Sequence, residues 1–411
     1  MADDLTGACD SGVEFMSRWS SVVVLVEPET CPPAEAGEGI IVYNTQSRKL
    51  PPKEAYDRAF RATRRALSPS ADLIFKKVDS ALRGNFGIEI AAAMDAAEAT
   101  VAFILPAIPQ AGRETIGGVQ HIGGVPIAKT FYARDPEHPV SESSVLHRAE
   151  EGSNRKAGLV SLDEVRSGRT AEAAVKLHHQ GHDLIVVDAQ STRDLHIAVQ
   201  SLLRVREPKV FAGCQGLARA LAAQLPTREG TPCGLECSEG PLLCLCGTLH
   251  PRTRRQLEVA ANSKEFLLFE VEVDHIADTS RANKALKELE LACRGGLGKG
   301  RTVALCFCGE PGGLSAEFCE SALRFLSDLS RRVVEHTPPA VLFLTGGETA
   351  FVVCRALGIH AVKLHARVAP LVVASKALGG PCHGMILVTK GGAIGPDDLI
   401  CRIHESLRGR K

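Results

Sequence analysis

Short apolar runs alternate with amphipathic helical patterns along most of this 411-residue chain. Alternating strands and helices form parallel sheets whose two faces are covered by the helices. The sequence therefore predicts an α/β fold with largely parallel sheets. The expected strands are 22–26, 40–43, 73–75, 101–105, 184–187, 210–212, 242–246, 266–271, 303–307, 341–344 and 385–388. The expected helices are 53–67, 88–97, 170–179, 193–203, 252–261, 281–293, 316–335 and 350–357.

The chain is longer than one hydrophobic core usually supports, so two domains are expected. Residues 226–241 contain clustered prolines and glycines without hydrophobic periodicity, which predicts a linker. We therefore expect two three-layer α/β domains, an N-terminal one over 1–228 and a C-terminal one over 240–411. Residues 117–129 carry two Gly-Gly pairs and predict a hairpin or flap instead of a helix.

Charge and hydropathy argue against several functions. Lys and Arg total 48, as do Asp and Glu, so nothing indicates a nucleic acid or an anionic membrane as partner. No apolar run is long enough to cross a bilayer, and the N-terminus has no signal-peptide pattern. These features predict a cytoplasmic protein.

The chain has fourteen cysteines. Many lie in apolar runs, as Cys244 and Cys246 do, and are expected to be reduced residues of the core. Together with Cys233 and Cys237 these two form the tightest group, but their spacing lacks the paired C-x2-C pattern of structural zinc sites. We predict no metal site, with a metal at these four cysteines as the minor alternative.

Charged residues concentrate in four loops of the N-terminal half, at 2–10, 43–48, 76–87 and 106–113. Open α/β sheets bind ligands beyond the carboxyl ends of their strands, so these loops form a candidate site. The cations suit a carboxylate or phosphate, and the acids suit a magnesium ion or a hydroxyl that loses its proton. Helix capping remains an alternative for one or two acids of the first loop, and an ion pair with Arg83 for Asp79. The cations are Arg48, Lys77, Arg83 and Arg113, and the acids are Asp3, Asp4, Asp10 and Asp79.

The C-terminal half has three glycine-containing loops between an expected strand and an expected helix, at 246–253, 344–350 and 390–396. Backbone N–H groups at such a junction can bind phosphate. Neither a Walker A motif nor a G-x-G-x-x-G fingerprint is present. Three such loops in one domain favour a nucleotide as ligand.

Several of these stretches together resemble one family, the four-carbon acid sugar kinases, which include D-threonate, D-erythronate and 3-oxo-tetronate kinases. The resemblance spans nearly the whole chain. Its N-terminal motifs are ADDLTGACD at 2–10, KKVDSALRGNFG at 76–87, PAIPQAGR at 106–113 and FYARDPEHPV at 131–140. Its C-terminal motifs are CGTLHPRTRRQ at 246–256, LTGGETA at 344–350 and KGGAIG at 390–395.

The resemblance implies that the N-terminal domain binds a sugar acid and that the C-terminal domain binds ATP with Mg²⁺. Phosphoryl transfer to the C4 hydroxyl would then occur in a cleft between the domains. The partners are accordingly a four-carbon sugar acid and ATP, and a homodimer is left open. The nucleotide-binding residues carried over from the family motifs are Thr248, His250, Gly346, Gly347, Glu348, Thr349, Gly391 and Gly392.

In the loops of the N-terminal domain we assign Arg48, Arg83 and Arg113 to the substrate carboxylate and hydroxyls. Lys77 is assigned to the carboxylate or the transferring phosphoryl group. Asp4 is the preferred general base, Asp79 orients the reacting groups, and Asp3 or Asp10 is the alternative base.

Two departures from the family pattern matter. The usual G-S-x-S appears as Gly247-Thr248-Leu249-His250, so a histidine replaces one hydroxyl. Relatives also carry an apolar strand before ADDLTGA, whereas only Met1 precedes it here. Without that strand, we expect two neighbouring strands of the central sheet to lack hydrogen-bonding partners. A catalytically inactive sugar-acid or nucleotide sensor is therefore the alternative function, and a kinase of another hydroxy acid is a further one.

Overall fold

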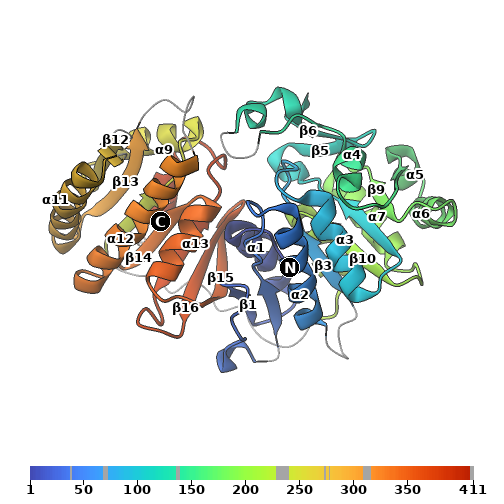
Figure 1. Cartoon of the computed structure of the whole chain (residues 1–411), viewed down its shortest axis with the longest axis horizontal. Helices are drawn as coiled ribbons and strands as arrows, with labels where there is room; N and C mark the ends of the chain where they lie inside the picture. Colours follow the sequence, from blue (N-terminus) through green and yellow to red (C-terminus); the bar gives the residue numbers. More distant parts are fainter. Residues whose placement is uncertain are drawn as a thin grey trace. The chain divides into compact units, whose positions relative to one another are not determined.

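This computed structural model describes residues 1–37, 39–67, 73–135, 139–227, 240–272, 275–276, 278–308 and 316–407. The chain forms two compact units, and each is described by itself. Unit 1 comprises Met1–Ser20 with Ile40–Gly230, and unit 2 comprises Ser21–Gly39 with Thr231–Lys411. Figure 1 shows strands and helices alternating along the chain in both units. Most of the predicted linker at 226–241, with Cys233 and Cys237, lies outside the described residues, so the predicted domain limits stay predictions.

Unit 1 is built on a five-stranded parallel sheet in the order β3-β10-β4-β9-β8. The side chains of β4 and β9 are buried at every position, although successive side chains point to opposite faces. Both faces are therefore covered, as the predicted three-layer fold requires. The strands of this sheet are β3 (Ile74–Lys77), β4 (Val101–Leu105), β8 (Ala157–Val160), β9 (Leu184–Val187) and β10 (Lys209–Gly213). Unit 1 also contains β2 (Ile40–Tyr43), which lies outside this sheet.

Helices contact this sheet and one another between the strands. Local sequence signals begin several of them: Ser191 and Asp194 form a capping box at the start of one, and a proline opens another. The helices are α1 (Leu5–Gly12), α2 (Pro52–Ala66), α3 (Phe86–Ala97), α4 (Val145–Glu150), α5 (Leu162–Arg166), α6 (Thr170–His179), α7 (Thr192–Leu202) and α8 (Gln215–Gln224).

The predicted hairpin at 117–129 is present as a small antiparallel sheet of three strands, β5 (Arg113–Ile116), β6 (Val119–Ile122) and β7 (Val125–Pro126). The turn between β5 and β6 is held by Asp188, whose carboxylate accepts from Gly117 N at 2.7 Å and Gly118 N at 2.9 Å. Both glycines have positive φ angles, of 59° and 71°, which other residues rarely adopt.

The strands of unit 2 follow the order β12-β13-β11-β14-β17-β16-β15-β1. The first five are parallel, and the last three join through antiparallel pairs. The strands are β1 (Val22–Leu25), β11 (Leu242–Cys246), β12 (Phe266–Glu272), β13 (Thr302–Cys308), β14 (Val341–Thr345), β15 (Ala361–Ala369), β16 (Val372–Leu378) and β17 (Ile386–Lys390). The helices are α9 (Pro251–Ala261), α11 (Thr279–Gly298), α12 (Ala316–His336), α13 (Gly347–Ala356) and α14 (Leu399–Leu407).

The core of unit 2 contains the cysteines that the sequence assigned to it. Cys244, Cys246 and Cys306 are buried among aliphatic and aromatic side chains, and they are free thiols. Burial raises the pKa of the Cys244 thiol well above its ordinary value, because the thiolate would lose its hydration. These cysteines therefore behave as small apolar residues.

Each predicted strand and helix is present to within a few residues, but the segment Ser21–Gly39 lies with unit 2 although the sequence places it inside the N-terminal domain. The reason is that β1 pairs with β15 in antiparallel register, with Val24 opposite Val362. In the described part of the chain, no helix is long and apolar enough to cross a membrane.

Candidate active site

The first residues of the chain lie at the carboxyl ends of β2 and β3. Ala2 forms parallel bridges with Asn44 and Lys77, which places Asp3 and Asp4 beyond the strand ends, where ligands of such sheets bind. Asp4 also caps α1, since its Oδ1 accepts a backbone N–H of the first helical turn at 3.2 Å. The capping alternative is thus realised for one of the acids.

Arg48 and Lys77 pair with both aspartates. Arg48 Nε lies 2.7 Å from Asp3 Oδ2, and Arg48 Nη2 lies 2.8 Å from Asp4 Oδ1. Lys77 Nζ lies 3.4 Å from Asp3 Oδ1 and 3.1 Å from Asp4 Oδ1. Burial raises the pKa of each carboxyl, but Arg48 and Lys77 outweigh it and hold the pKa of Asp3 and of Asp4 below the ordinary value. Both acids therefore remain ionised.

Asp79 and Arg83 form a bidentate ion pair, so the structural alternative for Asp79 is present in the fold. Arg83 Nε lies 2.9 Å from Asp79 Oδ2, and Arg83 Nη2 lies 3.1 Å from Asp79 Oδ1. Arg48 Nη2 lies 3.6 Å from the same carboxylate and connects this pair to the previous one. Burial opposes ionisation, but Arg83 and Arg48 hold the pKa of Asp79 well below its ordinary value.

The turn that carries Arg83 has a strained backbone and is held by a side chain of α4. Buried Leu82 and the following Gly84 have φ angles of 59° and 74°, and such a conformation is costly for leucine. Arg148 of α4 donates from Nε to Leu82 O at 3.1 Å and from Nη2 to Gly84 O at 2.7 Å. Arg148 therefore fixes the turn that positions Arg83. No sequence motif points to this residue.

Arg113 at the start of β5 is 8% exposed, and it differs from the other three cations. No carboxylate of the described residues lies within 4.0 Å of its guanidinium. Nη1 donates to Ser80 Oγ, and Nη2 donates to Tyr132 OH at 3.1 Å. The Tyr132 ring also lies 5.7 Å from Arg113 and 5.1 Å from Arg83. Arg113 thus presents a buried positive charge held by neutral partners.

Asp10 on α1 is the acid that is least matched by cations. Its Oδ1 accepts from Ser11 Oγ at 2.9 Å, and no cation of the described chain lies within 4.0 Å. Burial raises the pKa of Asp10 to about 7, an effect that Lys77 opposes and the nearby Asp4 charge increases. Its protonation state therefore changes near neutral pH.

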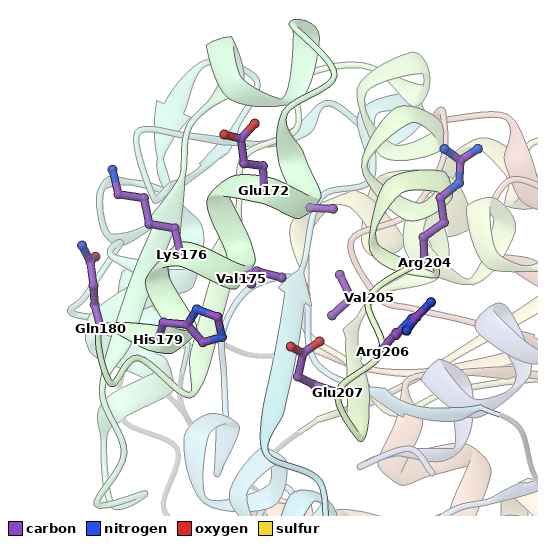
Figure 2. Close-up of a pocket in the computed structure, with 10 residues that line it drawn as sticks. Glu172, Val175, Lys176, His179, Gln180, Arg204, Val205, Arg206 and Glu207 are labelled. Carbon is purple, nitrogen blue, oxygen red and sulfur yellow. The ribbon is translucent and has the colours of Figure 1, made fainter.

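A cavity of about 350 Å³ reaches this cluster within unit 1. It is lined mainly by polar side chains, among them Arg48, Arg83, Asn85, Ser141, Glu142 and Arg148. A larger groove of about 680 Å³ lies between α6 and residues 204–207. Figure 2 shows its charged residues, including Lys176 and Arg204, projecting on either side of Val175 and Val205. This groove contains none of the predicted site residues.

Sequence reasoning missed three contacts of the cluster besides Arg148. Ser80 and Tyr132 bind Arg113, and Asp135 Oδ2 lies 3.1 Å from Arg83 Nη1. Tyr132 and Asp135 belong to the FYARDPEHPV stretch, so a signal existed without an assigned role. Ser80 lies within KKVDSALRGNFG, between two residues that were assigned.

In unit 2 the three glycine loops follow β11, β14 and β17, which are neighbours in the sheet. They touch one another: Gly346 N donates to Lys390 O at 2.9 Å, and a Cβ on Gly392 would lie 2.7 Å from Thr248 Oγ1. Gly346 has a φ angle of 104°, which requires glycine before α13. The structure thus brings the predicted nucleotide residues of all three loops to one edge of the sheet.

His250 has a structural function in this group. It is the N-cap of α9, and its Nδ1 accepts from Arg252 N at 3.1 Å. Thr248 Oγ1 in turn accepts from His250 N at 3.2 Å. The histidine that replaces the usual hydroxyl therefore caps the helix, and its predicted phosphate contact stays a prediction. No group of three or more potential metal ligands occurs among the described residues, which do not include Cys233 and Cys237.

Two domain families match the two halves of the chain. Residues 1–221 match a sugar-binding N-terminal domain, and residues 243–400 match a nucleotide-binding C-terminal domain. The D-threonate kinase of Salmonella typhimurium is 28% identical over 98% of this chain and 96% of its own. The chain belongs to the four-carbon acid sugar kinase family. The D-erythronate kinase of Heliobacterium modesticaldum is 29% identical over 98% of this chain and 94% of its own.

The fold of this family member is also found in a solved structure. A Salmonella typhimurium protein described as a putative tRNA synthase superposes with a TM-score of 0.80, covering 98% of both chains at 21% identity. That likeness concerns the fold alone.

Proposed function

We propose that this family member, an ATP-dependent sugar-acid kinase, phosphorylates the terminal C4 hydroxyl of a four-carbon acid such as D-threonate, D-erythronate or 3-oxo-tetronate. The observation that carries the proposal is the buried Arg113 guanidinium, which lacks a carboxylate within 4.0 Å in the described chain. A buried charge without a counter-charge is costly, and a carboxylate ligand removes that cost. The relatives named above act on such acids.

The substrate carboxylate would bind Arg113, with Arg83 as second donor. The Tyr132 ring lies against both guanidinium groups and fixes their planes. A planar guanidinium binds a carboxylate through two parallel hydrogen bonds, which favours acids over neutral sugars. Arg48 is paired with Asp3 and Asp4 and lines the cavity, so we assign it to the substrate hydroxyls.

Asp10 is our candidate for the general base, in place of Asp4. Asp4 accepts hydrogen bonds from Thr6, Arg48 and Lys77, and its pKa is lowered, so it holds a proton poorly. A base is most effective when its pKa lies near the working pH, which the Asp10 carboxylate satisfies. Lys77, beside Asp4, would then neutralise charge on the transferring phosphoryl group.

The N-terminal acids do not offer an evident magnesium site. Asp3, Asp4 and Asp79 are each paired with arginine or lysine, and a metal would have to displace those cations. Mg²⁺ typically binds phosphate oxygens and water with only one or two protein carboxylates. We therefore assign Mg²⁺ no protein ligand; bound to the ATP phosphates, it would supply charge neutralisation.

A coupled ADP-release assay over a panel of tetronates tests this function. ADP release that requires one acid of the panel, with a neutral four-carbon sugar as matched control, supports the kinase. Calorimetry with ATP and with each acid accompanies the assay. Binding of both ligands without turnover would favour the inactive sensor, and turnover of a longer hydroxy acid alone would shift the substrate class.

A further inference from the structure

The loop after β17 is held from one side by side chains of α9. Thr253 Oγ1 donates to Gly392 O at 2.7 Å, and Arg252 Nη1 donates to Gly395 O at 3.1 Å. Gln256 Nε2 lies 2.9, 3.3 and 2.8 Å from the carbonyl oxygens of residues 394, 395 and 396. Lys390 Nζ completes the set, at 3.1 Å from Gly391 O. Five carbonyl groups of residues 391–396 are thus bound by side chains.

This arrangement fixes the direction of the N–H groups. In a trans peptide the N–H points away from the carbonyl of the same unit, so the N–H groups of Gly392 and Ala393 point away from Lys390 and Thr253. Among the described residues, neither N–H has a recorded protein acceptor. Successive N–H groups on one side of a glycine turn form an anion-binding concavity. The Thr248 hydroxyl approaches Gly392 closely, so the three loops meet here.

Lys390 is an unusual residue for this position. Its side chain is 0% exposed, and within the described chain no carboxylate lies within 4.0 Å of Nζ. Its two recorded partners are Gly391 O and Thr253 Oγ1, both at 3.1 Å. Its other ionisable neighbours are the Cys246 thiol of β11 and Arg252 of α9. Burial, with a smaller effect of Arg252, lowers the pKa of Lys390 to about 8, and Cys246 opposes this decrease.

We propose that Lys390, together with Thr253, is a positioning residue for the nucleotide phosphates. It holds the carbonyl groups of the 391–396 loop toward α9, directs the N–H groups of Gly392 and Ala393 to the phosphates, and supplies a buried positive charge behind them. This inference rests on the proposed function, in which unit 2 binds ATP. Neither residue belongs to the nucleotide set that the family motifs provide.

The proposal predicts proton uptake on nucleotide binding. An anion bound in front of Lys390 stabilises the ammonium form and raises its pKa. Phosphate groups ionise with a second pKa of about 6, so uptake above pH 7.5 comes from the protein. The affinity of the wild-type protein for ADP should therefore decrease as the pH rises through about 8.

Calorimetric titration of the full chain with ADP from pH 7 to 9, in two buffers of different ionisation enthalpy, measures affinity and proton uptake together. Lys390→Met, which is nearly isosteric, should weaken ADP by about tenfold or more, the loss of one charge-assisted contact, and should abolish proton uptake. Thr253→Val should weaken ADP, and Thr253→Ser, which keeps the hydroxyl, should restore it. Matched controls are Lys299→Met, an exposed lysine, and Thr302→Val, a buried threonine bonded to Leu242 N.

The outcomes separate this inference from the proposed function. A wild-type protein that binds no nucleotide contradicts the proposed function. A wild-type protein that binds ADP, with a folded Lys390→Met variant of equal affinity and equal proton uptake, overturns only the role of Lys390. If Lys390→Met does not fold, the threonine pair decides: wild-type affinity in Thr253→Val overturns the proposal, and loss restored by serine supports it.

Discussion

Replacing Asp10 by asparagine gives the most direct test of the acid cluster. The amide keeps the shape of the side chain but cannot accept the hydroxyl proton. General base catalysis typically contributes about 10²- to 10⁴-fold, so kcat at pH 8 should fall by roughly that factor. Asp10 accepts a hydrogen bond from Ser11, and replacing Asp10 leaves the ion pairs of Arg48 and Lys77 in place. KM for both substrates should therefore change little.

The pH profile provides a second, independent readout of Asp10. With its pKa at about 7, the carboxylate form is present above that pH and is lost as the pH falls. Wild-type kcat should therefore decrease below pH 7, to roughly one tenth at pH 6, since one unit of pH below a pKa leaves about a tenth of the base ionised. The residual activity of Asp10→Asn should not show this step.

The Asp10→Asn variant should lose activity but gain in free energy of unfolding. The pKa of Asp10 rises from 3.8 to about 7 on folding, so its contribution to folding becomes less favourable as the pH increases between those values. At pH 8 the full difference corresponds to about 4 kcal/mol. Solvent reaches part of the side chain, so we expect the asparagine variant to gain only about 1–2 kcal/mol.

Steady-state kinetics from pH 5.5 to 8.5 and urea unfolding at pH 8 measure these effects, with Asp163→Asn as a control at an exposed acid of the same unit. Wild-type turnover in Asp10→Asn would refute the argument. If Asp4→Asn instead loses kcat with both ligands bound, the base is Asp4, as the sequence alone suggests.

Three further substitutions test the remaining parts of the site. Arg113→Ala should weaken the sugar acid by about 1.5–3 kcal/mol, or one to two decades, and leave ATP affinity unchanged in calorimetry; loss of ATP alone would contradict the assignment. Gly392→Ala should raise KM for ATP roughly tenfold, because its Cβ would lie 2.7 Å from the Thr248 hydroxyl. Gly295→Ala, where a Cβ meets nothing within 4 Å, is the control. Wild-type kinetics in Gly392→Ala would contradict nucleotide binding by this loop. Arg148→Met should raise KM for the acid and lower the free energy of unfolding by about 1–3 kcal/mol. The control Arg155→Met should affect only stability. An unchanged KM in Arg148→Met would contradict the role of Arg148 in holding Arg83.

The fold was predictable because buried parallel strands have a strong local signal. The runs at 101–105 and 184–187 are apolar at every position, and few other structures accommodate such segments. Three strands of the described chain outside the hairpin were missed. One of them, β8, is apolar, but it is only four residues long and contains a glycine; the other two carry polar side chains. β15 carries Lys363, His365 and Arg367 among its apolar residues, and β16 carries Ser375 and Lys376. Their pairing is set by neighbours distant in sequence, which local periodicity does not reveal.

The charged residues of the site were predictable because they lie at the ends of strands, and the sequence also locates those strands. Arg48, Lys77 and Arg83 lie at or beyond the carboxyl ends of β2 and β3, which the bridges of Ala2 bring together. Which cation pairs with which acid was not predictable, because that depends on side-chain reach across three loops. The contribution of Arg148 was harder to predict, since it acts through the carbonyl groups of Leu82 and Gly84 and not through its ion pair with Glu151.

Among the described residues, the charged residues of the site fall into two sets, those paired with an opposite charge and those without one. Arg48, Lys77 and Arg83 are held against Asp3, Asp4 and Asp79, and these pairs lower the pKa of the acids and keep the cluster ionised and fixed. Arg113 and Asp10 are the two members that this network does not neutralise at contact distance within the described chain. A sugar acid carries what each of them lacks, a carboxylate for the arginine and a hydroxyl proton for the aspartate. The unmatched groups are therefore those expected to bind the substrate carboxylate first and to activate the hydroxyl, while the matched cations, fixed by their acids, add further contacts to the substrate and the phosphoryl group.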